Sequence, residues 1–271
     1  MIWKKLQDID RRIIYTLMIV FLLYPMMFPI GIPIEIDATT KDVFNTLKAL
    51  NPATDTVVLA ASYSVGGAPD VGPQFDAVAK HLFELKIPFL VPSFVSDGPA
   101  QVERVLARLE SLGLVYGVDA VNLGFITGGE AAVKAFVDNP RTVFIKDFRG
   151  NVVADLPIMQ RVDKVTDLAY VLDFQTGNPG YADWIRQAPG VKYGAGLVTV
   201  SVPAAIPFVN SKQIVGMLKG LRGAAEYELL MERPALAVAK MDAQSLGHLL
   251  IVALIILGNT AHFVDKKLSK K

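Results

Sequence analysis

Small polar residues and glycines that suit ligand binding follow three apolar, β-rich runs of this sequence. They are Ser64, Gly66 and Gly67 after the run 56–63, Thr127, Gly128 and Gly129 after the run 120–126, and Asp173, Thr176 and Gly177 at the end of the run 168–174. In open α/β sheets ligands bind beyond the carboxyl ends of the strands, and glycines at the start of a helix expose backbone N–H groups that suit an anion. The sequence therefore predicts a small-ligand site at one edge of a sheet. The alternative is that these residues only shape and cap strand-to-helix turns.

Established catalytic patterns are missing from the sequence. The chain has no cysteine, which excludes thiolate metal ligands and cysteine nucleophiles. It has no G-x-x-x-x-G-K-[ST], G-x-G-x-x-G or G-x-S-x-G motif, and His81 is the one histidine outside its C-terminal apolar segment. We therefore predict no catalytic residue, no metal ligand set and no cofactor. A metal-dependent enzyme stays an alternative that requires Asp70, Asp119 and Asp173 to converge on one cation.

A stripe of small residues is predicted on a long helix over 211–231. Gly216, Gly220 and Gly223 are spaced four and three residues apart, and Ala224 lies beside them. A glycine inside a helix costs about 1 kcal/mol relative to alanine, so the stripe suggests that another backbone approaches closely. We predict helix-to-helix contact between subunits at this stripe. Packing against the protein's own sheet is the alternative.

Two long segments without charged residues, 13–34 and 243–264, lie near the two ends of the chain. Each is long enough to cross a hydrocarbon core of roughly 30 Å as a helix. We predict two transmembrane helices, the first of which loses regular helix at its prolines after Tyr24. A cleaved secretory signal is less favoured for the first segment because no A-x-A-like cleavage site follows it.

The charges that flank the two segments predict an orientation. Basic residues predominate in 1–12 and in the tail 265–271, whereas 35–242 has an acidic excess. The positive-inside rule then predicts that both termini are cytoplasmic and that 35–242 is a periplasmic or extracellular domain. The whole chain has 27 basic and 26 acidic residues, so it lacks the basic excess that a general nucleic-acid binder needs.

Apolar strands and amphipathic helices alternate within 35–242. Strands are expected at 56–63, 88–94, 120–126, 168–174 and 197–202, with a short strand pair at 142–145 and 152–156. Helices are expected at 39–50, 74–86, 99–112, 129–137, 181–187 and 211–231. This alternation predicts an α/β fold with a mostly parallel, Rossmann-like sheet and helices on both faces.

Two stretches of this domain, 116–124 (YGVDAVNLG) and 220–228 (GLRGAAEYE), carry a resemblance. The chain resembles uncharacterised prokaryotic membrane-anchored α/β proteins of unassigned function. The resemblance implies an anchored α/β architecture and no catalytic residues.

Three functions are compatible with these observations. The first is a non-enzymatic subunit that is anchored in the lipid bilayer and assembles as a homo-oligomer or with other membrane proteins. The second is a sensor or receptor that binds a small ligand at the strand-edge loops, and the third is the metal-dependent enzyme. We favour the first because the small-residue stripe is the most distinctive segment and no catalytic set is recognised.

Overall fold

The computed structural model describes residues 9–162, 164–165 and 168–268. These residues form two compact units. One unit is made of the two chain ends, up to Pro33 and from Pro234, and the other spans Ile34–Arg233. The basic residues Lys4, Lys5, Lys270 and Lys271, on which the predicted orientation partly depends, lie outside the described residues.

The unit Ile34–Arg233 contains a six-stranded parallel sheet with the order β3-β2-β1-β4-β5-β6. The strands are β1 (Val57–Ser62), β2 (Phe89–Ser93), β3 (Ala120–Phe125), β4 (Tyr170–Gln175), β5 (Tyr193–Leu197) and β6 (Gly216–Lys219). They are short apolar runs because a parallel sheet is covered on both faces. Strands β1 to β3 are added toward one edge of the sheet and β4 to β6 toward the other edge. The adjacent strands β1 and β4 therefore form a topological switch point.

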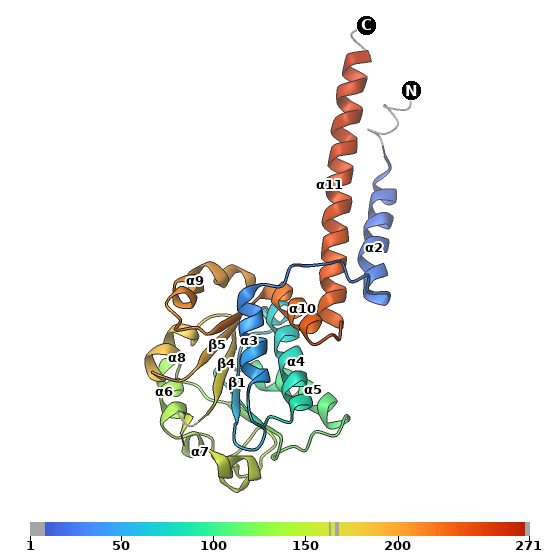
Figure 1. Ribbon diagram of the computed structural model, residues 1–271. Coiled ribbons are helices and arrows are strands. Elements are labelled where there is room, and N and C mark those ends of the chain that lie inside the picture. Colours follow the sequence, from blue (N-terminus) through green and yellow to red (C-terminus); the bar gives the residue numbers. More distant parts are fainter. Residues whose placement is uncertain (1–8, 163, 166–167, 269–271) are drawn as a thin grey trace. The chain divides into compact units, whose positions relative to one another are not determined.

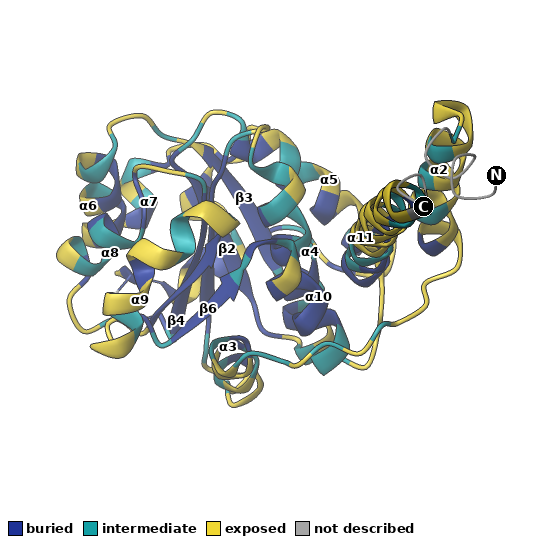
Figure 2. Ribbon diagram, turned by 90° about the horizontal axis from the view of Figure 1, so that it is seen from above, coloured by how far each residue is buried: buried dark blue, intermediate teal, exposed yellow. Residues whose placement is uncertain are grey.

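Helices cover both faces of the sheet, which confirms the predicted α/β class. One face carries α4 (Ala68–Leu85), α5 (Gly98–Glu110) and α10 (Gly220–Leu230), and the other carries α6 (Glu130–Asp138), α8 (Tyr181–Gln187) and α9 (Val202–Asn210) (Figure 2). Successive strand residues point to opposite faces, so Val57 and Leu59 belong to one hydrophobic core and Val58 and Ala60 to the other. The edge strand β6 is covered by α3 (Ala38–Lys48) (Figure 1).

The predicted strand pair at 142–145 and 152–156 is wrong. These segments form the helical turn α7 (Pro140–Val143) and the 3-10 helix η1 (Val153–Asp155), which a second 3-10 helix, η2 (Pro157–Arg161), follows. Asn139 caps α7, because its side-chain oxygen accepts hydrogen bonds from the backbone N–H groups of Arg141 and Thr142. A single antiparallel bridge between Lys146 and Val152 is all that remains of the expected pairing within the described part of the chain.

The strand predicted at 197–202 is also wrong, and the helix predicted at 211–231 is confirmed only over α10 (Gly220–Leu230). Strand β5 ends at Leu197 and is followed by the 3-10 helix η4 (Thr199–Ser201) and by α9, whereas 216–219 form β6. The true strand β5 is rich in glycine because a Cβ atom at Gly194 or Gly196 would overlap the side chain of Tyr170 or Phe174 on the adjacent strand. Strand propensity favours β-branched residues and disfavours glycine, so the sequence pattern did not predict β5.

We expect Gly220→Ala to destabilise the protein more than Gly190→Ala. Both glycines have a positive φ, 55° and 86° respectively, so each substitution costs about 1–2 kcal/mol from backbone strain. An added Cβ atom at Gly220 would also overlap Thr199 Oγ1, whereas nothing lies within 4 Å of one at Gly190. The overlap should add about 1–3 kcal/mol. Thermal unfolding of both variants measures the difference, and equal losses of stability would contradict the expectation.

The other unit contains α2 (Arg11–Met27) and α11 (Leu236–Leu268), which lie side by side (Figure 1). Among the described helices only α11, over Leu236–Lys267, is long and apolar enough to cross a membrane. The predicted N-terminal span is not shown, because α2 has 17 residues and ends where prolines become frequent.

One carboxylate holds the chain that follows α2. Asp242 is buried, and its Oδ2 atom accepts hydrogen bonds from the N–H groups of Ile30 (2.9 Å) and Gly31 (2.8 Å). Its Oδ1 atom accepts one from Ile32 N–H (3.0 Å). The three bonds satisfy backbone donors that have no helix or strand partner, so Asp242 fixes the exit from α2 against α11.

Candidate functional site

A pocket of about 410 Å³ lies at the carboxyl ends of β1 and β4, where the strand order reverses. We call it the switch-point pocket. It is lined by Ser64, Gly66, Gly67, Pro69, Asp70, Thr176, Val198 and Val200. The carboxyl edge at a switch point is where open parallel sheets bind ligands. The lining includes Ser64, Gly66, Gly67 and Thr176 from the sequence-predicted set.

The loops after β1 and β4 are joined directly at this pocket. Ser64 N–H donates a hydrogen bond to Thr176 Oγ1 (3.1 Å), and the two hydroxyl oxygens are 3.5 Å apart. A Cβ atom at Gly67 would overlap the Thr176 methyl group. Glycine at position 67 therefore lets α4 begin against the β4 loop, so its function here is close packing.

The opposite wall is held by the first turns of α4. Asp70 Oδ2 accepts hydrogen bonds from Thr199 N–H (3.1 Å) and from Thr199 Oγ1 (3.0 Å). Gln74 Nε2 donates to the carbonyl oxygens of Leu197 (3.0 Å) and Gly220 (2.8 Å). These bonds fix the segment after β5, which supplies Val198 and Val200 to the pocket.

The pocket has an acidic character. Asp70 is the one ionisable residue in its lining, and Asp97 lies close by, where its Oδ2 atom accepts the N–H of Val65 (3.0 Å). Both carboxylates lie near the start of α4, so they oppose the positive end of the helix dipole. Val65 and Val200 are exposed beside the pocket and give its rim an apolar part.

The remaining sequence-predicted ligand residues lie elsewhere. Thr127, Gly128 and Gly129 follow the edge strand β3, which is separated from β1 by β2. They do not line the pocket, and a Cβ atom at Gly128 would contact Ala132 of the following helix. Gly177 follows Thr176 but faces open space. Strand order therefore separates loops that sequence reasoning had placed at one common site.

Asp173 lies inside the fold and not in a loop. It is fully buried in β4, where its Oδ2 atom is 3.4 Å from the hydroxyl of Tyr193, and Gln175 Nε2 donates to the same hydroxyl (3.1 Å). Among the described residues, Asp173 Oδ1, Ser62 Oγ and Trp184 Nε1 have no hydrogen-bond partner. Burial raises the pKa of Asp173 to about 7, although nearby Ser62, Tyr193 and Trp184 favour its charged form.

The predicted stripe of small residues does not form one helix face. Gly216 lies in β6, where a Cβ atom would meet Val43 of α3, and α10 begins only at Gly220. A Cβ atom at Gly223 would meet the backbone of Leu218, and Ala224 is fully buried. The four residues pack within the domain because β6, α3 and α10 approach one another closely there.

The three aspartates of the metal-enzyme alternative are not brought together. Asp70 follows β1 at the carboxyl edge of the sheet, whereas Asp119 precedes β3 at the amino edge, roughly 17–20 Å away by strand length. Asp173 is fully buried within β4. In residues 9–162, 164–165 and 168–268 no group of three or more acidic or histidine side chains is arranged to hold a metal ion.

His81 is a residue of the hydrophobic core. Its Nδ1 atom is 2.7 Å from the Tyr227 hydroxyl, and its ring stacks on Phe44 with a centroid distance of 4.7 Å. Burial, with a smaller contribution from nearby Lys48, lowers the pKa of His81 to about 4. The imidazole is therefore neutral near pH 7 and has a packing role.

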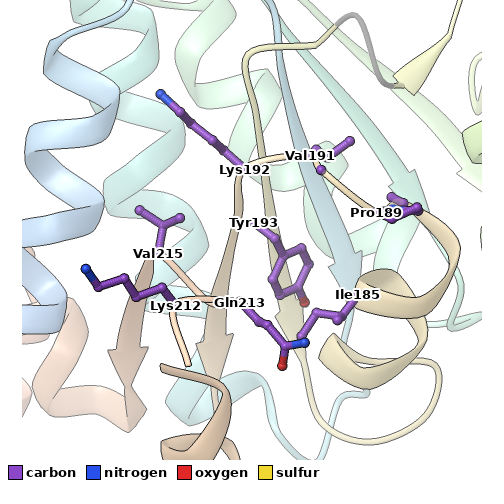
Figure 3. A pocket seen from close by; sticks show the side chains of 10 residues that line it. Ile185, Pro189, Val191, Lys192, Tyr193, Lys212, Gln213 and Val215 are labelled. Carbon is purple, nitrogen blue, oxygen red and sulfur yellow. The ribbon is translucent and has the colours of Figure 1, made fainter. Parts of the chain in front are cut away.

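A second pocket of about 410 Å³ lies at the amino ends of β5 and β6. Ile185, Val191, Tyr193 and Gln213 contribute to its lining (Figure 3). The side chains of Lys192 and Lys212 belong to the same lining but point away from Tyr193 and Ile185 (Figure 3). This pocket is at the opposite edge from the one where parallel sheets bind ligands, so the switch-point pocket is the better candidate.

Sequence reasoning missed Val198 and Val200 as site residues. Both were assigned to a strand, because the true position of β5 was hidden by its glycines. Asp70 was considered only as a metal ligand. The carboxyl end of β5, once that strand is placed at Tyr193–Leu197, would have indicated Val198 and Val200. Asp70 instead follows β1, a few residues after Gly66 and Gly67.

Comparison of the chain with protein-family models, with curated proteins and with solved structures finds no match. The geometry and chemistry of the pocket therefore carry the functional interpretation.

Proposed function

We propose that this chain is a membrane-anchored receptor or sensor whose α/β domain binds a small polar ligand at the switch-point pocket. The observation that carries the proposal is the position of that pocket. The hydroxyl groups of Ser64 and Thr176 and the open backbone at Gly66 meet there, at the carboxyl edge of a parallel sheet. A volume of about 410 Å³ falls in the range of small-molecule sites.

This proposal ranks above an assembly subunit and above a metal-dependent enzyme. The small-residue stripe was the reason to expect contact between subunits, and its glycines are occupied by the domain's own side chains and backbone. Assembly as a homo-oligomer or with other membrane proteins stays a prediction without that support. The structure does not support the metal-dependent enzyme either, because Asp70 and Asp119 lie at opposite edges of the sheet.

The anchoring part of the proposal is a pair of transmembrane helices with both termini in the cytoplasm. It is supported by the length and composition of α11, by the pairing of α2 with α11, and by the basic residues at both chain ends. The α/β domain would then face the periplasm or the outside of a prokaryotic cell. A receptor in this arrangement samples ligands outside the bilayer that anchors it.

The chain has no cysteine, so single cysteines test this orientation directly. We expect a cysteine at Asn178, in the loop after β4, to react with a membrane-impermeant thiol reagent in intact cells. A cysteine at Ser269, in the C-terminal tail, should react only after the membrane is permeabilised. The reverse pattern would invert the proposed topology.

Filling the pocket should abolish ligand binding without unfolding the domain. Gly66 lines the pocket, and a Cβ atom there has only Ser64 Oγ within 4 Å, at 3.8 Å, so Gly66→Leu is the variant chosen to fill the pocket. Gly72→Leu is the matched control, because a Cβ atom at Gly72 has nothing within 4 Å and the residue does not line the pocket.

The measurement is a thermal-shift screen of small metabolites against the full-length protein in detergent. The proposal expects at least one compound that stabilises the wild type and Gly72→Leu but has no effect on Gly66→Leu. If every stabilising compound acts equally on all three proteins, or if none is found, the pocket is not the functional site.

A further inference from the structure

We infer that the switch-point pocket selects small organic amines that carry hydroxyl groups, and that it rejects phosphates. This inference rests on the proposed ligand site and names the class of ligand that it takes. The strand order 3-2-1-4-5-6 is the order of dinucleotide-binding sheets, which makes a phosphate the obvious first expectation. The chemistry of the lining contradicts that expectation.

The backbone N–H groups of the loop after β1 are already used. Those of Gly67 and Ala68 donate to Ser64 O, and that of Asp70 donates to Gly67 O, whereas Pro69 has none. The N–H of Ser64 is bonded to Thr176, and that of Val65 to Asp97. Gly66 N–H is the one donor of residues 64–70 without a partner in the described structure. Phosphate loops present several free N–H groups to one anion, so this loop lacks their defining feature.

The charge around the pocket also opposes an anion. Among the described residues, the lining contains no lysine, arginine or histidine, and Asp70 contributes a carboxylate. Asp97 adds a second carboxylate beside the loop. These two groups compensate the start of α4, so the helix dipole leaves little positive potential for a ligand phosphate.

The same groups suit a ligand that donates hydrogen bonds. Both contacts from Thr199 to Asp70 use Oδ2, so Oδ1 has no partner among the described residues and can accept from an ammonium group. Within the described structure the Ser64 hydroxyl has a contact only with Thr176 Oγ1, at 3.5 Å, and it can both donate to and accept from a ligand hydroxyl. Val198 and Val200 leave space for a short carbon skeleton between the polar groups.

Three compounds of related skeleton distinguish the classes: 2-amino-1,3-propanediol, glycerol and glycerol 3-phosphate. They are cationic, neutral and anionic at neutral pH, and ligands this small bind in the millimolar range. The full-length protein in lipid nanodiscs, labelled with ¹⁵N-glycine, reports binding through the amide signals of Gly66 and Gly67. The signals of Gly150 and Gly190, which have nothing within 4 Å of their Cβ positions and do not line the pocket, are the internal control.

We expect the amine to bind most tightly and to shift the Gly66 signal. Asp70→Asn should weaken amine binding about tenfold and leave glycerol binding within a factor of about two, because it removes the charge but keeps an acceptor for Thr199. Asp97→Asn is the matched control and should weaken amine binding less, since Asp97 does not line the pocket.

Glycerol 3-phosphate as the tightest ligand, or equal binding of the amine and glycerol, would overturn the amine assignment while the ligand site itself stands. Absence of binding by all three compounds would also overturn the assignment. The screen with Gly66→Leu then decides separately whether the pocket binds any small molecule.

Discussion

The free energy of unfolding of Asp173→Asn, measured relative to wild type, should rise by up to about 4 kcal/mol between pH 4 and pH values above 7. Asp173 is fully buried in β4, and burial raises the pKa of its carboxyl group from 3.8 to about 7. In the folded protein the group stays protonated over a range of pH in which the unfolded chain has already lost the proton.

The sign of the effect follows from this difference. Between about pH 4 and pH 7 the folded state binds the Asp173 proton more tightly than the unfolded state, so the free energy of unfolding falls as pH rises. Above pH 7 both states are ionised and the loss is complete. Asparagine has the same shape and no such titration, and its amide group can donate to the unpartnered Ser62 Oγ.

Thermal unfolding of both proteins at pH 5 and pH 8 measures about 3 kcal/mol of this effect, because part of it is already lost by pH 5. The melting temperature of Asp173→Asn relative to wild type should therefore be higher at pH 8 than at pH 5 by roughly 5–10 °C. The difference between the proteins is the relevant quantity, because His81 changes stability in the opposite direction: its pKa of about 4 costs stability as pH falls below 6.5. Asp138→Asn, the same chemical change at an exposed aspartate of α6, is the matched control variant. An equal difference between wild type and Asp173→Asn at both pH values would contradict the burial of an uncompensated carboxyl group.

Asp242→Ala should release the segment after α2 from α11. The substitution leaves the N–H groups of Ile30, Gly31 and Ile32 without their acceptor. Hydrogen bonds to a charged acceptor contribute about 1.5–3 kcal/mol each. Because Asp242 accepts three of them, the free energy that holds this segment to α11 should fall by more than about 3 kcal/mol. The pairing of α2 and α11 depends on this contact because the segment has no helix or strand bonds of its own.

A pair of introduced cysteines measures that pairing. The Cβ position of Gly247 is 3.3 Å from Leu22 Cδ2, so cysteines at 22 and 247 should be joined efficiently by a short thiol cross-linker in an otherwise cysteine-free chain. We expect Asp242→Ala to lower the cross-linked fraction several-fold. Asp242→Asn should have an intermediate effect, since one of the two acceptor oxygens becomes a donor, and Asp265→Ala near the end of α11 should have none. Equal cross-linking in the wild type and Asp242→Ala would show that Asp242 does not hold the helices together.

The buried Asp173 also belongs to the support of the candidate site. Its partner Tyr193 receives a hydrogen bond from Gln175, and Gln175 Oε1 accepts the N–H of Tyr181 (2.9 Å). This chain of contacts joins the core of the sheet to the loop that carries Thr176 into the switch-point pocket. Changes at Asp173 are therefore best measured together with ligand binding.

Local sequence patterns located most of the regular elements. The run 56–63 corresponds to β1 and 99–112 to α5, because a strand buried on both faces is almost wholly apolar and an amphipathic helix repeats its apolar residues every three to four positions. The segment 197–202 was misassigned because its β-branched residues suit a strand in isolation, whereas the real β5 needs glycines to accommodate Tyr170 and Phe174. Cross-strand contacts of this kind are invisible to local propensity.

The sequence by itself determined the α/β class, the long apolar helix near the C-terminus, and Ser64, Gly66, Gly67 and Thr176 as loop residues that follow strands. Only the tertiary structure decided that the loop after β1 meets the loop after β4, that the loop after β3 lies apart, and that Asp173 is buried. The physical reason is that composition and periodicity report on neighbours along the chain. Strand order and burial depend on contacts between residues far apart in sequence, which no local pattern encodes.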